Sequence, residues 1–151
     1  MIKSLSIHEP YASLIRTGAK TYETRSWPTK YRGLLLICAA KGGMSKKVLM
    51  KMLGQCHVKQ GLFPLANYKI SPSAAYNRLN FGRAVALVEI VDCFQVPSPE
   101  FDPVVEAKQT WYGDFNPGMY AWKLKMINNT FKPFPVKGQQ GLFSVNVEGK
   151  V

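Results

Sequence analysis

The fold and the candidate site both centre on one ten-residue stretch, Gly18-Ala19-Lys20-Thr21-Tyr22-Glu23-Thr24-Arg25-Ser26-Trp27. A glycine at its start is typical of a helix that ends in a left-handed cap, and residues 20–27 predict a strand. Strand alternation places four side chains on one face: Thr21, Glu23, Arg25 and Trp27. Lys20 has the opposite parity, so it joins Glu23 only if the backbone turns at Lys20 or the long side chain reaches across.

Short strands and helices are predicted on both sides of this stretch. Further strands are expected over residues 4–8, 34–40, 82–96, 119–127 and 142–147, and helices over residues 10–18, 45–53 and 72–79. The long strand at 82–96 is expected to bend. A loop at 97–103 is expected to lead into a helical turn through Glu106. Residues 55–80 are otherwise irregular, because Gly61, Pro64 and Pro72 interrupt them, and we expect an insertion or lid there.

These elements do not follow a strict strand-helix-strand alternation. The sequence therefore predicts an α+β fold, a small mixed β-barrel flanked by two or three short helices. No segment has the composition of a linker between domains, so residues 1–151 are expected to form a single domain.

Composition narrows the class of protein. The chain has 151 residues, of which 46% are hydrophobic, so it is long enough to bury a core. Its longest hydrophobic run, Leu34 to Ala40, is far shorter than the roughly 20 residues of a membrane-spanning helix. Without a signal-peptide core, the protein is expected in the cytoplasm, or in the nucleus of a eukaryote, and not outside the cell. Three Cys and two His without zinc spacing predict neither a metal site nor a cofactor.

The charge is strongly asymmetric along the chain. The net charge is +11, yet residues 1–88 hold 14 Lys and Arg against two acids, Glu9 and Glu23. Residues 89–151 hold 6 Lys and Arg against 7 acids. Such asymmetry favours a polyanionic partner: RNA, DNA or a phosphorylated ligand. The alternative is a basic surface that only aids solubility.

A compact charged site is predicted from Lys20, Glu23 and Arg25. Neighbouring cations favour the ionised form of Glu23, which then serves as a hydrogen-bond acceptor or a base. Lys20 beside this carboxylate can form a proton-transfer pair, or grip a phosphate while Glu23 accepts from a sugar hydroxyl. The alternative is a structural salt bridge at the rim of the barrel.

Three segments of the chain resemble a known family. The first combines Ser6-Ile7-His8-Glu9-Pro10-Tyr11-Ala12-Ser13-Leu14-Ile15 with Gly18-x-Lys20-x-x-Glu23-x-Arg25-x-Trp27 and Tyr31-Arg32-Gly33. The second is Gly113-Asp114-Phe115-x-Pro117-Gly118-x-Tyr120-Ala121-Trp122, and the third is Pro135-Val136-Lys137-Gly138-x-x-Gly141-Leu142-Phe143. Together and in this order they resemble the ASCH domain, the activating-signal-cointegrator homology family of the PUA-like superfamily.

The resemblance implies a PUA-like β-barrel with a nucleic-acid-binding cleft lined by residues 20–27. Some small family members remove acetyl groups from acetylcytidine, and ribonuclease activity is also ascribed to the family. The amidohydrolase type uses a Lys, a Thr three residues later and a more distant Glu. Lys20 matches that Lys, but Glu23 stands in the Thr position, and the distant Glu aligns only loosely with Glu106.

Further residues are predicted to contact nucleic acid. Trp27 stacks on a base, or else packs in the barrel. His8 reaches the cleft. Backbone phosphates meet basic side chains from residues 16–83, among them Lys30, Arg32, Lys46 and Lys47.

Three hypotheses about function follow. The first is a nucleic-acid-binding domain, with RNA favoured over DNA, that accepts a base or nucleoside near Lys20. The second is a hydrolase acting on a modified nucleoside or on RNA, in which Lys20 and Glu23 move protons and Thr21 or Thr24 assists. The third is a module whose basic face docks on an acidic protein. No membrane partner is expected.

Overall fold

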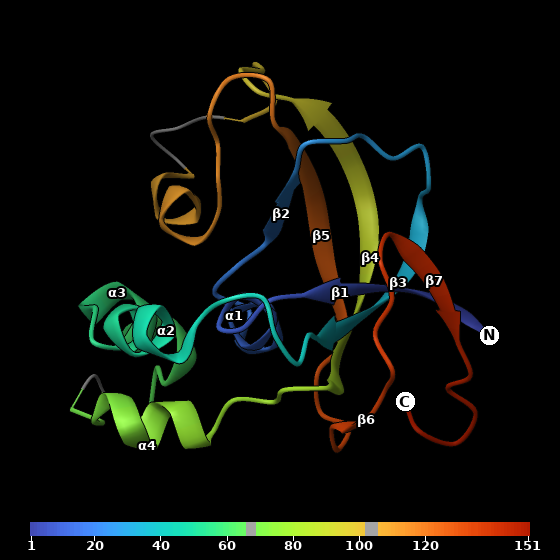
Figure 1. Ribbon diagram of the computed structural model, residues 1–151. Helices are drawn as coiled ribbons and strands as arrows, with labels where there is room; N and C mark the ends of the chain where they lie inside the picture. Colours follow the sequence, from blue (N-terminus) through green and yellow to red (C-terminus); the bar gives the residue numbers. More distant parts are fainter. Residues whose placement is uncertain (66–68, 102–105) are drawn as a thin grey trace.

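The computed structural model of the chain describes residues 1–65, 69–101 and 106–151. It places seven strands in one mixed sheet, with a group of short helices beside it (Figure 1). The strands are β1 (Ile2–Ile7), β2 (Tyr22–Arg25), β3 (Gly33–Ala39), β4 (Arg83–Gln95), β5 (Tyr120–Asn128), β6 (Phe134–Pro135) and β7 (Leu142–Val145). The helices are α1 (Tyr11–Thr17), α2 (Lys46–Leu53), α3 (Cys56–Leu62), α4 (Pro72–Asn77) and the 3₁₀ helix η1 (Ala107–Tyr112). The predicted α+β class is confirmed.

The sheet is built around β4, which has 13 residues and pairs with both β3 and β5. The strand order is β2-β5-β4-β3-β1-β7, and β6 pairs with the start of β4. β1 runs parallel to β3, whereas the other paired strands are antiparallel. The pairing with β5 shifts register near Leu87 and again near Ile90, and β4 curves there as the sequence predicts (Figure 1).

The sheet is open, so the predicted closed β-barrel is not confirmed. In the described part of the chain, no backbone ladder joins the edge strands β2 and β7. The sheet stays open because β7 is short and pairs with β1 only from Ile2 to Leu5. Beyond Leu5 a side chain crosses the gap instead, because Nη2 of Arg25 in β2 donates to the carbonyl of Ser6 in β1 at 2.9 Å. We call this gap between β2 and the end of β1 the seam.

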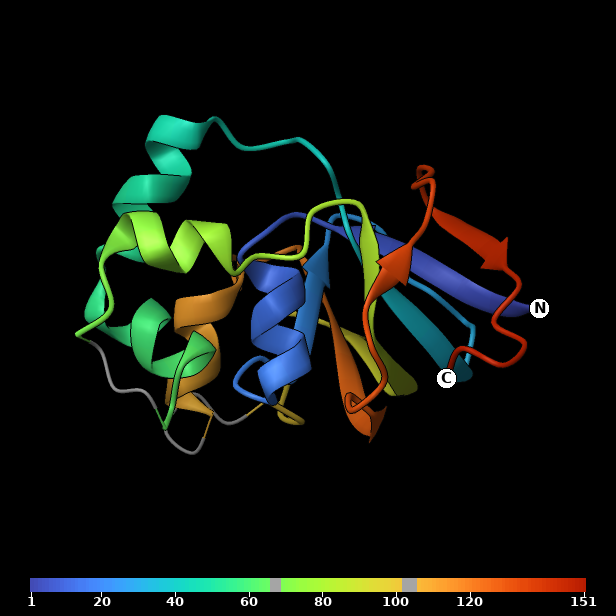
Figure 2. The same ribbon diagram turned by 90° about the horizontal axis from the view of Figure 1, so that it is seen from below.

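Helix α1 lies between the sheet and the other helices (Figure 2). Its Ala12 and Ile15 are buried with strand residues such as Leu35 and Trp122. Leu14, on the same helix, is buried in a second cluster that includes Leu49 and Leu53 of α2. The helix therefore has apolar contacts on two sides, which fixes the position of the residues that follow it.

Residues 55–80 contain more regular structure than the sequence predicts. Helix α4 confirms the expected helix, but α3 was not predicted because Gly61 reads as an interruption. In the structure Gly61 is where α3 approaches α1, since a Cβ atom there would lie 2.6 Å from Cδ2 of Leu14. Residues 66–68 of the expected lid lie outside the described residues.

Two further expectations concern the remaining segments. The helical turn expected through Glu106 falls partly on residues 102–105, which lie outside the described residues, and η1 begins directly after Glu106. No helix within the described ranges is both long enough and apolar enough to span a bilayer.

Candidate functional site

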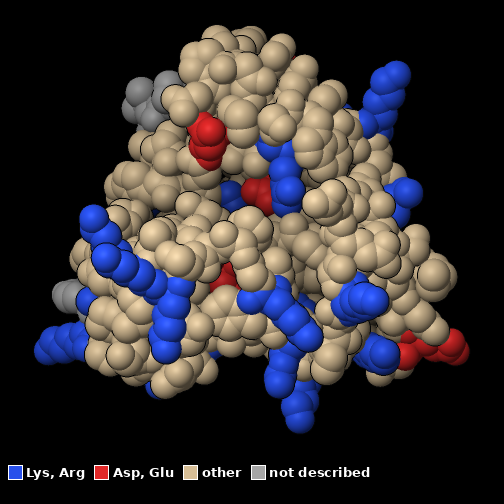
Figure 3. Space-filling view, in the orientation of Figure 1, with Lys and Arg blue, Asp and Glu red and all other residues tan. Residues whose placement is uncertain are grey.

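A cavity of about 280 Å³ opens at the seam. We call it the seam cavity; its walls come from β1, α1, β2 and the segment after η1, and they comprise Ile7, His8, Tyr11, Lys20, Glu23, Thr24, Arg25, Tyr112, Gly113 and Asp114. Figure 3 shows a hollow on this face, with an acidic side chain at its floor and basic side chains on either side. The cavity therefore contains both signs of charge.

Lys20 reaches the cavity because the backbone turns between α1 and β2. Gly18 ends α1 in the left-handed conformation, with φ of 86°, and the N–H of Lys20 folds back onto the carbonyl of Leu14 at 3.0 Å. The strand begins only at Tyr22, so strand parity does not apply to Lys20. The sequence left open whether Lys20 joins Glu23 through a backbone turn or through the reach of its long side chain, and the structure shows the backbone turn.

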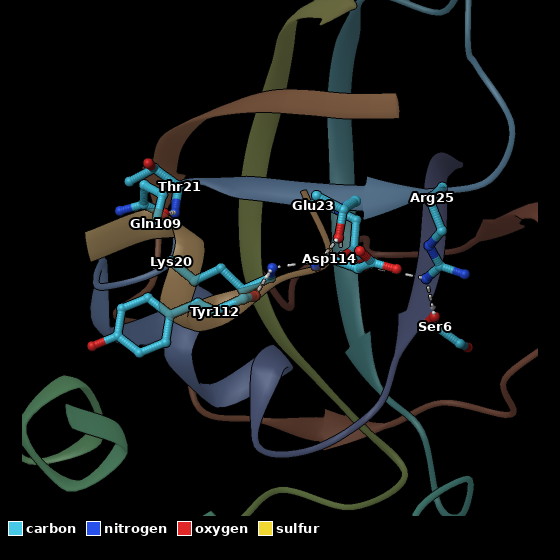
Figure 4. A network of polar contacts seen from close by, with 9 residues as sticks. Ser6, Lys20, Thr21, Glu23, Arg25, Gln109, Tyr112 and Asp114 are labelled. Carbon is cyan, nitrogen blue, oxygen red and sulfur yellow. Dashed lines mark hydrogen bonds and ion pairs between the residues drawn. The ribbon is translucent and has the colours of Figure 1, made fainter. Parts of the chain in front are cut away.

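The amine of Lys20 is buried among three partners (Figure 4). Its Nζ atom donates to the carbonyl of Tyr112, lies 3.7 Å from Oε1 of Glu23 and sits 5.3 Å from the ring centre of Tyr11. Lys20 is only 2% exposed. Burial lowers the pKa of Lys20, while the Glu23 carboxylate opposes that shift and the Arg25 charge adds to it. The amine therefore gives up its proton more readily than an ordinary lysine.

The Glu23 carboxylate is held from both sides. Its Oε1 accepts from the backbone N–H of Thr24 at 2.9 Å, and its Oε2 accepts from Nη2 of Arg25 at 3.2 Å. The same guanidinium nitrogen bonds Ser6 across the seam, so one arginine both bridges the sheet edges and orients the carboxylate (Figure 4). Charge-assisted bonds of this kind fix geometry. The carboxylate is thus positioned to accept a hydrogen bond from a ligand.

The wall opposite β2 consists of Tyr112, Gly113 and Asp114. The backbone N–H of Asp114 donates to Oγ1 of Thr24 at 2.9 Å. Gly113 permits this approach, because a Cβ atom there would lie 2.9 Å from that hydroxyl and 3.3 Å from Nζ of Lys20. Tyr11 and the three residues of this wall were not among the site residues predicted from the sequence, because that prediction relied on the side chains of residues 20–27. The signal was present in the Gly113-Asp114 motif, whose contact with Thr24 spans 90 positions.

The predicted catalytic residues separate into two places. Lys20, Glu23 and Thr24 line the seam cavity together with Arg25. Thr21 lies behind it, where its backbone N–H donates to Gln109 at 2.8 Å and Gln109 in turn donates to the carbonyl of Ala19 at 2.9 Å. This amide link anchors η1 to the turn that carries Lys20.

Glu106 is not part of the cavity wall. Its Oε1 lies 3.4 Å from the hydroxyl of Tyr22, whose ring belongs to an aromatic cluster with Phe94 and Phe101. Burial, aided by the nearby Glu106 charge, raises the pKa of Tyr22 to about 12. Because Tyr22 and Glu23 alternate along β2, Glu106 lies on the opposite face of that strand from Glu23. Glu106 therefore does not take the place of the distant Glu that accompanies the Lys in the amidohydrolase type.

The predicted nucleic-acid contacts also separate. His8 is exposed and lines the seam cavity. Trp27 packs edge-on against Trp122, with ring centres 4.8 Å apart, and its carbonyl accepts from that indole at 3.4 Å. These contacts correspond to the packing alternative for Trp27.

Four predicted basic residues lie outside the cavity wall. Arg32 is 3.7 Å from Asp92 and donates to the carbonyl groups of Thr29 and Tyr31. Lys30 is exposed. Lys46 and Lys47 are exposed on α2, and the Lys46 amine lies 4.8 Å from the ring centre of Tyr76. None of these four basic side chains therefore lines the seam cavity.

Comparison with models of known protein families gives a match. The model of the ASCH domain family matches residues 5–131, which include the seam cavity. None of the curated proteins matches the chain significantly. Within the described ranges, no three His, Cys, Asp or Glu side chains gather in a way that could hold a metal ion. The family match covers most of the sequence, and the chain therefore belongs to the ASCH domain family, a PUA-like family of RNA-binding type.

Proposed function

We propose that this chain binds single-stranded RNA and accepts one base or nucleoside in the seam cavity. The observation that carries the proposal is the Lys20–Glu23–Arg25 network, in which Lys20 and Glu23 are buried, at the floor of an open cavity. Salt bridges that only stabilise a fold do not need an accessible cavity beside them. Here the cavity brings an outside group within reach of both a carboxylate and two cations.

The size and polarity of the cavity support a nucleoside. Its volume of about 280 Å³ lies near the lower end of the usual range for small-molecule sites, which suits a single base and not a duplex. Glu23 accepts from a base amino group or a ribose hydroxyl, while Arg25 donates to a base carbonyl. Tyr11 and His8 supply rings at the wall for stacking. A carboxylate that recognises a 2′-hydroxyl favours RNA over DNA.

The surrounding charge supports a nucleic-acid strand. The net charge is +11, and all of the excess lies in residues 1–88. These residues build β1, β2 and α1 at the cavity, and also β3, α2, α3, α4 and the start of β4. Phosphate contacts from this surface supply affinity that depends on salt. The acidic-protein hypothesis does not use the cavity, so RNA is the better-supported partner.

Binding is tested with a fluorescein-labelled single-stranded RNA in an anisotropy titration. We expect salt-dependent binding by the wild type and weaker binding by Glu23→Gln, which keeps the shape of the side chain but removes its charge. Glu89→Gln is the matched control, because Glu89 lies on β4 outside the cavity wall. Equal affinity of all three proteins contradicts the role of the cavity.

A hydrolase is the second candidate, and the lowered pKa of the buried Lys20 favours it. In this reaction the Lys20 amine first gives up its proton and then takes a proton from water, while the water oxygen adds to the acyl carbon of an acetylated base amine. The amine then leaves with a proton, which yields acetate and the free base. Thr24 and Glu23 replace the Thr and distant Glu of the amidohydrolase type, so the substrate need not be acetylcytidine.

The hydrolase candidate is tested separately from binding. Wild type, Glu23→Gln and Lys20→Met are incubated with a panel of modified nucleosides, acetylcytidine included, and with short RNAs, and products are read by mass spectrometry. Product that disappears in both variants supports hydrolysis. Binding without any product supports the RNA-binding function and contradicts the hydrolase candidate.

A further inference from the structure

A second, larger cavity lies on the other side of the end of β1. It has a volume of about 740 Å³ and opens between Ser6, the end of β3 with Lys41, and the segment 135–140. We call it the loop cavity. The function proposed above does not use it, and its wall contains no acidic residue.

The loop cavity has several unpaired hydrogen-bond donors. Among the described residues, the backbone N–H groups of residues 137–140 donate to no acceptor, and the buried hydroxyl of Ser6 has no hydrogen-bond partner. Lys41 and Lys137 add two cations to the wall. Residues 137–140 are exposed, so their N–H groups are accessible to an acceptor from outside, whereas the buried Ser6 hydroxyl is a donor of the kind that proteins normally satisfy. Donors and cations without an acid fit an anion.

Two glycines shape the cavity. A Cβ atom at Gly138 would lie 2.7 Å from the Ser6 hydroxyl, so glycine lets the segment close over that residue. Gly82 has φ of 71°, and a Cβ atom there would lie 2.8 Å from Cε of Lys41. The Lys41 stem therefore packs against Gly82 in the wall of the cavity. The lysine is placed by packing and is not free to turn in every direction.

The loop cavity is a neighbour of the seam cavity. Ser6 belongs to both regions, because its side chain lines the loop cavity while its carbonyl accepts the Arg25 bond at the seam. The next two residues, Ile7 and His8, line the seam cavity. Figure 3 shows further basic side chains on the same face below the hollow. A strand that leaves the seam cavity over His8 thus meets the loop cavity next.

We propose that the loop cavity binds the backbone phosphate next to the nucleotide whose base occupies the seam cavity. This inference rests on the proposed RNA-binding function and assigns the direction in which the strand continues. The phosphate oxygens accept from the N–H groups of residues 137–140, the Ser6 hydroxyl and the amines of Lys41 and Lys137. Phosphate recognition by backbone amides and lysines carries no sequence preference.

The test measures the salt dependence of binding to a labelled 12-residue oligouridylate. For single strands, each lost phosphate contact lowers the slope of log affinity against log salt by about 0.7. Because both lysines contact the same phosphate, the double variant Lys41→Ala, Lys137→Ala is expected to lower the slope by about 0.7 and to weaken binding several-fold. Lys123→Ala, Lys125→Ala removes the same charge from exposed positions on β5 and is the matched control.

A variant that changes no charge distinguishes a specific phosphate contact from the general attraction between a basic protein and RNA. Ser6→Ala removes a hydroxyl that makes no hydrogen bond in the described part of the protein, so folding is expected to be unchanged. Its affinity for the oligonucleotide is expected to fall while the salt slope stays the same.

The outcomes distinguish this inference from the proposed function. If the wild type does not bind the oligonucleotide, the proposed function fails and this inference fails with it. If the wild type binds but the loop-cavity pair behaves like the β5 control, only this inference is overturned. Unchanged affinity of Ser6→Ala alongside a slope change in the lysine pair removes Ser6 from the site but supports the phosphate contact.

Discussion

The seam cavity and the loop cavity differ in how their charged groups meet water. At the seam, Lys20 is 2% exposed and Glu23 is 6% exposed, and both are fixed by hydrogen bonds. In the loop cavity, Lys41 and Lys137 are exposed. Buried, oriented charges discriminate between ligands, whereas exposed charges add affinity that salt screens. In the proposed function, the seam cavity is therefore the selective site and the loop cavity is the nonselective one.

Removal of the seam carboxylate is expected to have the largest effect. Glu23→Ala leaves the buried Lys20 amine and the Arg25 guanidinium without their shared partner, and loss of one member of a buried ion pair typically costs about 3–5 kcal/mol. Urea denaturation of the variant measures this loss of unfolding free energy. Glu89→Ala, outside the seam, is the control and is expected to change stability by about 0.5 kcal/mol or less. Similar losses in both variants would mean that the seam network is not buried as described.

Crowding of the cavity wall is expected to have a smaller effect on stability. Gly113→Ala places a methyl group against Oγ1 of Thr24, 2.9 Å away, and so separates the two walls. Overpacking of this kind costs about 1–3 kcal/mol. Gly42→Ala is the matched control, since nothing lies within 4 Å of the added methyl group. Thermal denaturation and RNA affinity are measured for both; an undisturbed Gly113→Ala protein contradicts the close contact.

The burial of Lys20 predicts how stability depends on pH. Its pKa is lowered from the ordinary 10.5, so the unfolded chain binds this proton more readily than the folded chain. The free energy of unfolding therefore rises as the pH increases toward 10.5, from the Lys20 contribution alone. The wild type is compared with Lys20→Met between about pH 7 and pH 9, below the range where the tyrosines titrate. A stability difference that does not change with pH contradicts the lowered pKa.

The smallest effect is expected from α2. Lys46 and Lys47 lie outside both cavity walls, and the Lys46 amine lies over the ring of Tyr76. Lys46→Ala, Lys47→Ala is therefore expected to change the salt slope less than the loop-cavity pair does. A slope decrease of about 0.7 or more would instead place the RNA strand over α2.

Local signals in the sequence predict much of this molecule. Gly18 correctly predicts the end of α1, and the apolar run at 34–40 correctly predicts β3, because caps and buried strands depend on near neighbours. The pairing of Glu23 with Arg25 follows from their two-residue spacing on one strand.

Contacts between distant residues explain what the sequence alone does not predict. Gly61 lets α3 pack closely against Leu14 of α1, and a single sequence does not contain that contact. The Tyr112 carbonyl accepts a hydrogen bond from Lys20, which is 92 residues away in the sequence. Glu106 accepts from Tyr22, on the face of β2 opposite to Glu23. The open seam depends on how far β7 extends along β1. Each of these outcomes is decided by tertiary packing.

The central claim is that a base of an RNA strand enters the seam cavity. Photo-crosslinking with a single-stranded RNA that contains 4-thiouridine, followed by peptide mass spectrometry, tests this claim most directly. The account predicts crosslinks to His8 or Tyr11, whose aromatic side chains line the cavity. These crosslinks should decrease in Glu23→Gln. Crosslinks confined to α2 or to the sheet edge at β7, with none at the seam, would contradict it.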